Sequence, residues 1–228
     1  MKTALCIVVP VLHEAARITR CLSALAPLRQ RGVKVVVVDG GSDDQTVALA
    51  QPLADVVLCA ERGRARQMNA GAAACDAGAY LFLHADTQLP ALADQQVLAA
   101  LEGGALWGRF DVQIDPPGWT LRLVAKLMNW RSRVSGIATG DQAIFVRADA
   151  WKAIHGFADL PLMEDIDLSS RLKRIGRPAC LTERVLTSAR RWEKHGVLRT
   201  VWLMWRLRLA YFLGADPGQL AQRYEHAR

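Results

Sequence analysis

The sequence predicts an α/β fold, in which a doubly wound, mostly parallel central sheet is flanked by helices and followed by an amphipathic helical tail. Two observations predict the sheet. Short runs of β-branched residues alternate with segments whose apolar residues recur at helical spacing. Turn-forming residues separate these segments, and neither an internal repeat nor a low-complexity linker interrupts them. Such alternation is typical of parallel sheets that carry helices on both faces.

The elements follow in order along the chain, most regularly in its N-terminal half. Strands are expected at Leu5–Val9, Val33–Val38, Val56–Cys59 and Tyr80–His84, and helices around Ile18–Leu25, at Thr46–Ala50 and at Arg66–Cys75. Later segments predict a helix ending at Leu101, a strand at Leu106–Ile114, a helix at Trp119–Trp130, a strand at Gln142–Val146 and a helix that begins at Glu164. We expect one domain over residues 1–195, with halves 1–100 and 101–195, and a helical extension over 196–228.

Composition and charge narrow the class of protein. Hydrophobic residues make up 51% and charged residues 22% of the 228 residues, as in folded globular proteins. The net charge of +7 suits an anionic partner such as nucleic acid, acidic lipid or a phosphorylated substrate. We expect no nucleic-acid partner, because the aromatic and basic residues of a single-strand binding platform are absent.

Cysteine usage and hydropathy indicate the compartment. The five cysteines are scattered, without the close pairs of a zinc or redox site, and we expect them to be reduced and buried. No uncharged stretch approaches the roughly 18–20 residues that span a bilayer. We therefore expect a cytoplasmic protein, either soluble or at the inner face of the membrane.

A polar turn follows the second strand. Its glycines permit a tight turn, and Ser42 and Asp44 can cap the next helix. Asp39 ends a buried strand, and ligands of open α/β sheets lie beyond the carboxyl ends of the strands, so this carboxylate can also bind a nucleotide base or ribose. Taken alone, the pattern fits turn chemistry and nucleotide contact equally well.

Three arginines, Arg62, Arg64 and Arg66, alternate with small residues before the third predicted helix. Guanidinium groups and free amides at a helix start can both face a phosphate. The alternate spacing does not place the three side chains on one helical face, which favours an extended approach to the helix. A solvated basic turn is the alternative to the diphosphate partner that we favour.

His84 and Asp86 lie two residues apart at the end of an apolar strand, where alternate positions face the same side. Magnesium or manganese is usually held by one or two carboxylates together with substrate phosphates, so Asp86 alone would suffice. An aspartate that closes a strand is more often a helix cap, so this motif depends on the rest of the chain for its interpretation.

Glu164, Asp165 and Asp167 crowd the first turn of a predicted helix. Negative charge at that position stabilises the helix dipole, which would be a sufficient structural reason. Crowded carboxylates beside an apolar segment also have a raised proton affinity, so the cluster can contain a general base. Only one of the three need be catalytic.

Taken together, these segments resemble the family 2 glycosyltransferases of the GT-A fold, over a stretch from Ile7 to Trp192. The resemblance depends on the order of the matching strings. They are Val9–Glu14 (the opening strand and its Pro-x-x-Asn-Glu turn), Asp39–Thr46 (the nucleotide-binding turn), Arg66–Gly71 (the Asn-Ala-Gly helix start), Tyr80–Asp86 (the metal-binding Asp-x-Asp), Gly140–Gly156 (the acceptor side), Glu164-Asp165 (the Glu-Asp pair) and Ser188–Trp192 (the Gln-x-x-Arg-Trp motif). Several strings also resemble a small bacterial subgroup named for arsenosugar biosynthesis.

The resemblance implies transfer of a sugar from a nucleoside-diphosphate sugar to an acceptor hydroxyl, by a metal-assisted, inverting single displacement. It assigns the nucleotide sugar to residues 1–100 and the acceptor to 101–195, with Mg or Mn as the divalent cation. The residues carried over are Asp165 as the catalytic base, Asp86 and His84 at the metal, and Pro10, Glu14, Asp39, Ser42, Arg64, Arg66, Asn69, Gly71, Glu164, Arg191 and Trp192 at the substrates.

Two positions depart from the family pattern. His84 stands where the family has the first aspartate of Asp-x-Asp, and Ser188 stands where processive members have glutamine. Transfer of one sugar to a small-molecule or lipid-linked acceptor is therefore expected in preference to polymer synthesis.

The helix predicted over Val197–Leu213 carries Trp202, Trp205 and other large apolar residues on one face, with Arg199 and Arg206 on the other. A helix of this composition can lie in a membrane interface, dock on the protein's own core, or pair with a second subunit in a homodimer. The sequence leaves these three arrangements open.

Two other functions remain alternatives. A nucleotidyltransferase with a related core would attack an α-phosphate and would need no base such as Asp165. A catalytically degenerate sugar-nucleotide-binding or interaction module would bind the ligand without turnover. The released product separates the enzymes, because glycosyl transfer yields a nucleoside diphosphate and nucleotidyl transfer yields pyrophosphate.

Overall fold

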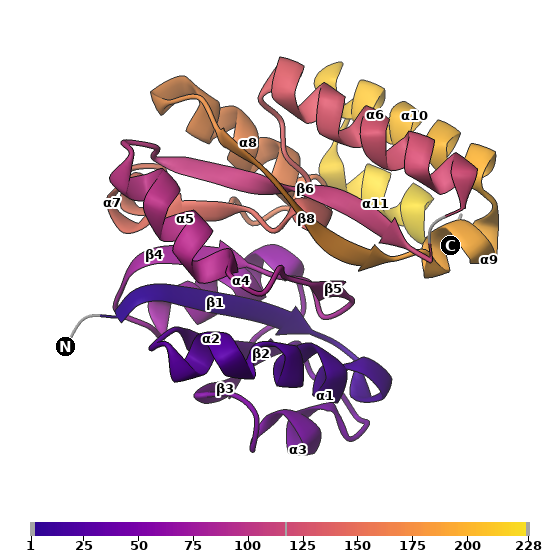
Figure 1. Cartoon of the computed structure of the whole chain (residues 1–228). Helices are drawn as coiled ribbons and strands as arrows, with labels where there is room; N and C mark the ends of the chain where they lie inside the picture. The colour runs from indigo at the N-terminus through magenta and orange to yellow at the C-terminus, as the bar shows by residue number, and fades with distance from the viewer. Residues whose placement is uncertain (1–2, 117, 227–228) are drawn as a thin grey trace.

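One mixed sheet forms the centre of the molecule. A computed structural model of the chain describes residues 3–116 and 118–226, within which the strand order is β3-β2-β1-β4-β7-β6-β8-β5 (Figure 1). The strands are β1 (Thr3–Val11), β2 (Lys34–Asp39), β3 (Val56–Cys59), β4 (Ala77–Phe82), β5 (Thr87–Gln88), β6 (Trp107–Asp115), β7 (Phe145–Arg147) and β8 (Ala179–Ser188). β1 pairs in parallel with β2 and β4, as do β2 with β3 and β6 with β8, whereas β7 runs antiparallel to β4 and β6, and β5 runs antiparallel to β8. The predicted, mostly parallel sheet is confirmed.

Helices cover both faces of this sheet. They are α1 (Ala15–Ala24), α2 (Ala26–Gln30), α3 (Thr46–Ala50), α4 (Arg64–Ala73), α5 (Ala93–Glu102), α6 (Trp119–Ser135), α7 (Ala148–Ala153), α8 (Glu164–Ile175), α9 (Arg190–His195), α10 (Val197–Phe212) and α11 (Pro217–His226). Along β1, Ile7 and Val9 belong to the core beneath α1, α2, α5 and α6, whereas Cys6 and Val8 belong to the core beneath α4, α7 and α8. This period of two confirms that the sheet is wound on both faces.

Two predicted boundaries near the site are wrong. β4 ends at Phe82, and although the Leu83 amide still donates to the Val8 carbonyl, the chain then turns. His84 and Asp86 therefore lie in the turn between β4 and β5 and not in a strand. α4 begins at Arg64, so the expected extended approach through Arg64 and Arg66 is replaced by the first helical turn.

The second half contains elements that the pattern did not predict. β8 was missed because its middle, Thr182–Arg184, is exposed and polar. The irregular register opposite Phe110 and Asp111 accommodates this stretch. Residues Gly140–Gln142 form a 3₁₀ turn and not the start of the predicted strand, and α6 continues beyond its predicted end at Trp130 to Ser135.

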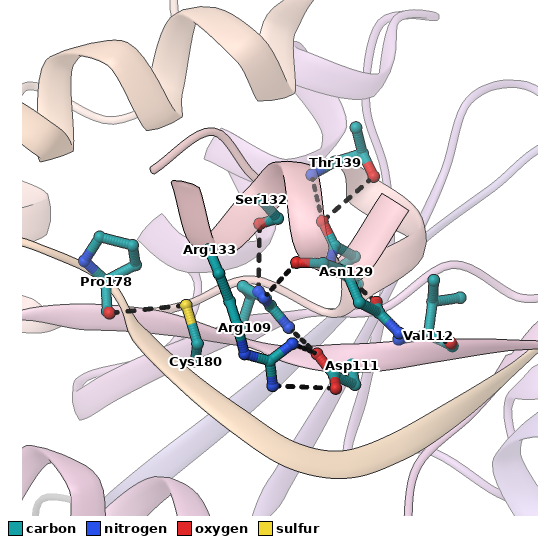
Figure 2. Close-up of polar contacts among 10 residues, drawn as sticks. Arg109, Asp111, Val112, Asn129, Ser132, Arg133, Thr139, Pro178 and Cys180 are labelled. Atoms are coloured by element: carbon teal, nitrogen blue, oxygen red, sulfur yellow. Dashed lines mark hydrogen bonds and ion pairs between the residues drawn. The ribbon is translucent and has the colours of Figure 1, made fainter. Parts of the chain in front are cut away.

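A buried polar network fixes α6 to β6 (Figure 2). The fully buried Arg109 donates to the Ser132 hydroxyl at 3.1 Å and pairs with Asp111, which Arg133 also binds at 2.8 and 2.9 Å. Asn129 exchanges two hydrogen bonds with the backbone of Val112. Because burial of an unpaired arginine is costly, this network holds one face of α6 in a single orientation against the sheet.

The described residues test two expectations, that the cysteines are reduced and buried and that no segment spans a membrane. The five cysteines are free, and Cys6, Cys21 and Cys75 are buried, but Cys59 is exposed and Cys180 is partly exposed, so the expectation of burial is wrong for these two. Within residues 3–116 and 118–226, no helix combines the length and apolar character that a membrane crossing requires.

Candidate active site

A cavity of about 540 Å³ opens beyond the carboxyl ends of β1 and β4. Its wall is formed by Pro10, Val11, Leu12, Glu14, Arg62, Gly63, Arg64, Gln67, His84, Ala85, Asp86, Asp141, Pro161, Leu162, Glu164, Thr187, Ser188, Arg190, Trp192, Lys194, Ala221 and Tyr224. Seven predicted site residues meet there, from five separate segments of the chain: Pro10, Glu14, Arg64, His84, Asp86, Glu164 and Trp192. The expected position at the carboxyl ends of the strands is therefore the position of the cavity.

Gln67 holds the floor of the cavity together. Its buried side-chain amide donates to the carbonyls of Val11 and Val38, both at 2.8 Å, and so joins the ends of β1 and β2 to α4. Nearby, Glu14 accepts a hydrogen bond from Arg17 at 2.8 Å. This part of the wall is fixed before any ligand binds.

The turn after β4 carries His84 and Asp86. The Nδ1 atom of His84 lies 3.3 Å from a carboxylate oxygen of Asp141, and the imidazole packs so closely on Gly140 that a Cβ there would lie 2.5 Å from the ring. Asp86 accepts a hydrogen bond from the Thr87 hydroxyl at 3.4 Å. The ring is thereby oriented by the 3₁₀ turn that contains Asp141.

The donor atoms of this wall fit a divalent cation only in part. Among the described residues, no group of three or more histidine, cysteine, aspartate or glutamate side chains is arranged to hold a metal. Mg²⁺ and Mn²⁺ do not need such a group when substrate phosphates supply further oxygens, since one or two carboxylates then suffice. Asp86 on the cavity wall provides one such carboxylate.

Glu164 is the most strongly perturbed carboxyl group on the wall. It is 6% exposed, and burial, the nearby charge of Asp165 and the incomplete compensation by Arg64 together raise its pKa above the ordinary value. Its Oε1 atom lies 3.8 Å from a guanidinium nitrogen of Arg64. A raised pKa makes a carboxylate a better proton acceptor than an ordinary one.

Asp165 follows Glu164 in α8 but is not part of the cavity wall. Its carboxylate accepts hydrogen bonds from the amide of Gly140 at 2.9 Å and from that of Ile166 at 2.8 Å. The base predicted from the sequence is therefore held against the same turn that orients His84.

Asp39 and Ser42 lie outside the cavity wall and bind each other. The buried carboxylate of Asp39 accepts hydrogen bonds from the amides of Gly41 and Ser42, at 2.9 and 2.8 Å, and from the Ser42 hydroxyl. That hydroxyl also accepts from the amide of His13. The predicted tight turn is confirmed, but the expected helix cap by Ser42 is wrong, because its hydroxyl binds Asp39 and His13 and the amide of Thr46 donates to Asp44 instead. Contact with a nucleotide stays a prediction.

Among the described side chains, three further predicted residues are also absent from the wall. Arg66 binds Asp159 through two hydrogen bonds, and Asn69 exchanges two with the backbone of Phe157. At Gly71 a Cβ would lie 2.4 Å from a methyl group of Val8, so the glycine permits α4 to pack on β1. Arg191 is the second residue of α9, and its side chain lies outside the described part of the structure.

Several wall residues were not predicted. Thr187 reaches the cavity from the end of β8, so the missed strand concealed it, whereas Ser188 beside it belongs to the quoted string Ser188–Trp192 but was not predicted as a site residue. Tyr224 comes from α11. Asp141 had a signal, because it lies in the segment Gly140–Gly156 that resembles the family's acceptor side. Arg62 belongs to the arginine segment described above but was not among the residues predicted to bind a substrate.

Comparison with known families decides the relationship. The model of the family described as "Glycosyl transferase family 2" matches residues 6–153, well over half of the chain. The chain belongs to glycosyl transferase family 2. The matched region contains the cavity residues from Pro10 to Asp141, whereas α8 and its carboxylates follow it.

Solved structures show the same fold. The S. aureus TarS 1–349 structure has a TM-score of 0.66 at 16% identity, and the match covers 82% of this chain and 61% of that one. A mannosyltransferase from Pyrobaculum calidifontis, solved with GDP-Man and Mn²⁺, has a TM-score of 0.65 at 18% identity, covering 100% and 70%. A glucosyl-3-phosphoglycerate synthase from Mycobacterium tuberculosis, solved with Mn²⁺, UDP and phosphoglyceric acid, has a TM-score of 0.59 at 18% identity, covering 80% and 68%.

These likenesses establish the GT-A glycosyltransferase fold of this family 2 member. The chain spans about three fifths of the TarS 1–349 structure. The comparison with curated proteins found no match, and the arsenosugar subgroup that the sequence resembles receives no support from the matches.

Proposed function

We propose that this family 2 protein transfers one sugar from a nucleoside-diphosphate sugar to an acceptor hydroxyl, with inversion at the anomeric carbon. One observation carries the proposal: the cavity combines Asp86 and two arginines, Arg62 and Arg64, with the start of α8, where Glu164 and Asp165 lie. A metal-binding carboxylate and cationic groups suit a diphosphate, and an acidic helix start beside them suits a base.

The diphosphate would lie between Asp86 and the arginines. A divalent cation, when bound by Asp86, would supply positive charge to the phosphate oxygens. Arg64 contributes a guanidinium to the same cavity, and its pairing with Glu164 at 3.8 Å leaves donors for a second anion. Positive charge placed where the leaving group becomes negative lowers the barrier to its departure.

Asp165 would act as the base. As the acceptor oxygen forms its bond to the anomeric carbon, the proton of the acceptor hydroxyl passes to the carboxylate of Asp165. The bond from the anomeric carbon to the diphosphate oxygen breaks at the same time, which releases the nucleoside diphosphate. The amide of Gly140 orients Asp165 for this role. Glu164, which lies on the wall with a raised pKa, is the second candidate for the same step.

His84 and Trp192 would position the substrates. His84 is oriented on two sides, since its Nδ1 atom lies 3.3 Å from Asp141 and its Nε2 edge packs on Gly140, and the ring so held lines the cavity together with Asp86. Trp192 offers a flat apolar surface to a sugar ring or an acceptor. Whether a metal also binds His84 is tested by the effect of His84→Asp, which restores the family pattern and would increase metal affinity if the position ligates the ion.

The released product tests the proposal. We would incubate the purified full chain with labelled sugar nucleotides and either Mn²⁺ or Mg²⁺, and separate the products by chromatography. The expected result is cation-dependent release of a nucleoside diphosphate, with strong loss of release in Asp86→Asn. Release of pyrophosphate would identify a nucleotidyltransferase, and tight binding of every donor without any turnover would identify a degenerate binding module.

A further inference from the structure

Two helices at one end of the molecule leave large apolar side chains in solvent. α6 and α10 lie together at this end (Figure 1). Burial, together with the nearby charge of Arg208 on α10, lowers the pKa of Arg131 on α6 to about 10. The tryptophan face, as we name it, consists of Trp119, Leu123, Leu127, Trp130 and Val134 on α6 and Leu198, Trp202, Trp205, Leu209, Phe212 and Leu213 on and just after α10. Exposed apolar patches of this extent usually mark an interaction site.

The exposure is a property of the helix faces and not of frayed ends. On α6 the exposed residues recur every three or four positions, opposite the buried Leu121, Ala125 and Asn129. Asn129 belongs to the network that fixes this helix to β6 (Figure 2), so α6 cannot rotate its tryptophans inward without breaking buried hydrogen bonds. α10 repeats the arrangement, with Leu207 buried opposite its exposed stripe.

The charge around the tryptophan face has one sign. Neither helix contains an aspartate or glutamate between Trp119 and Ser135 or between Val197 and Phe212. Arg122 and Lys126 are exposed on α6, as are Arg199 and Arg206 on α10. The guanidinium carbon of Arg206 lies 4.4 Å from the centre of the Trp202 ring, so cationic and aromatic groups are adjacent.

We propose that the tryptophan face binds the surface of an anionic lipid bilayer. Tryptophan and leucine side chains would enter the boundary between headgroups and acyl chains, while arginine and lysine contact the phosphates, as amphipathic helices do when they lie in an interface. A second copy of this chain fits less well. A symmetric dimer would place the same face against itself, which would bring two sets of cations together with no acidic residue on either helix to pair with them.

The position of the tryptophan face relates membrane binding to the cavity. α10 follows α9, which supplies Arg190, Trp192 and Lys194 to the cavity wall, and α11 supplies Tyr224. A bilayer bound at α6 and α10 would therefore lie beside the cavity edge formed by α9. The proposal concerns binding alone and does not depend on the proposed catalytic activity.

Sedimentation with vesicles tests the proposal. The full chain would be mixed with vesicles of phosphatidylcholine alone or of phosphatidylcholine with phosphatidylglycerol, at low and at physiological salt. We expect binding to the anionic vesicles, weakened by salt, with a blue shift of tryptophan fluorescence. The double variants Trp119→Ser/Trp130→Ser and Trp202→Ser/Trp205→Ser should each reduce partitioning by about tenfold or more, because each removes two buried aromatic side chains from the bilayer.

Two further variants control the test. Arg199→Gln/Arg206→Gln removes charge from exposed positions and should reduce binding to anionic vesicles by about thirtyfold, at about 1 kcal/mol per arginine. Leu92→Ser/Ile175→Ser removes exposed apolar residues elsewhere on the surface and should bind as the wild type does. Absence of binding at low salt, or equal binding by all variants, would overturn the proposal. So would a wild-type dimer, measured by light scattering, that the tryptophan variants dissociate.

Discussion

The two halves of the cavity wall hold their polar side chains differently. On the N-terminal side, Gln67 on the wall and Asp39 and Asn69 outside it form hydrogen bonds with backbone groups of the protein. On the C-terminal side, Glu164 is buried with a raised pKa, 3.8 Å from its nearest cationic partner. The difference shows that motif residues can have distinct roles. The N-terminal group fixes the shape of the site, and Glu164 on the C-terminal side keeps a carboxyl group that can take up a proton.

The largest effect that would test this contrast is expected at the start of α8. Asp165→Asn should reduce turnover by about 10²–10⁴-fold, the usual contribution of a general base, because the amide cannot accept the proton of the acceptor. Stability should fall by about 0.5–1.5 kcal/mol, because the single asparagine oxygen can replace only one of the two carboxylate oxygens that accept from the Gly140 and Ile166 amides. Turnover would be measured by nucleoside diphosphate release, and folding by thermal melting.

Glu164→Gln is the matched control for that substitution, because it changes the neighbouring carboxylate to an amide in the same helical turn. We expect a smaller loss of turnover than in Asp165→Asn. If Glu164→Gln abolishes turnover while Asp165→Asn retains it, the base is Glu164 and the carry-over from the family motif is wrong.

A substitution at Gly71 should affect stability first. In Gly71→Ala the new Cβ would lie 2.4 Å from Cγ1 of Val8 and 2.9 Å from Cγ2 of Val38, and such overpacking costs about 1–3 kcal/mol. Chemical denaturation would measure the loss. Adding Val8→Ala removes the nearest methyl groups, so the double variant should be destabilised by less than the sum of the two single changes. Additive losses would contradict a packing role for Gly71.

A comparable loss of stability is expected at an ion pair that fixes α5 of the N-terminal half. Arg31 binds the 5%-exposed Asp94 through two hydrogen bonds of 2.7 Å, and these bonds hold the pKa of Asp94 below its ordinary value. Asp94→Asn should therefore cost about 1.5–3 kcal/mol of stability at pH 7. Because the folded-state pKa is depressed, this stabilisation is present above the ordinary pKa of about 4 and is lost as the pH falls below it.

Asp149 in the C-terminal half is the matched control. Arg147 binds it through two hydrogen bonds of 2.6 and 2.7 Å, which lower its pKa to about 2, but the side chain is 64% exposed. Solvent screening should limit the cost of Asp149→Asn to about 1 kcal/mol or less. Denaturant melts at pH 7 and pH 3 would compare the two variants, and a loss in Asp94→Asn that does not shrink at pH 3 would contradict the assigned ion pair.

The elements of the fold that the sequence predicts best are those with a single dominant signal. The valine run of β2 and the apolar run Leu5–Val9 of β1 are buried on both faces, so their apolar character alone identifies them. β8 escaped prediction because its exposed polar middle, Thr182–Arg184, is stabilised by pairing with β6 and not by its own pattern. Pairing with a distant segment of the chain, and not local sequence, therefore determines that this segment is a strand.

For the site, sequence order predicted which segments converge but not which side chains point into the cavity. Pro10, His84 and Asp86 reach it as expected, whereas Asn69 and Arg66 turn to protein partners. One helical residue rotates the side chain by about 100°, and the pattern of a short motif does not resolve that difference. α4 starts two residues earlier than predicted, which explains why Arg64 and Arg66 lie in a helical turn and not in an extended segment.

The central claim is that the cavity binds the diphosphate of a sugar nucleotide through Asp86 and a divalent cation. Thermal melting with each common nucleoside diphosphate, with and without Mn²⁺ or Mg²⁺, tests it most directly, because a ligand bound only by the folded state raises the melting temperature. We predict stabilisation by one nucleoside diphosphate that requires the cation and is lost in Asp86→Asn. Stabilisation that is independent of the cation and unchanged in Asp86→Asn, or no stabilisation by any nucleoside diphosphate, would contradict it.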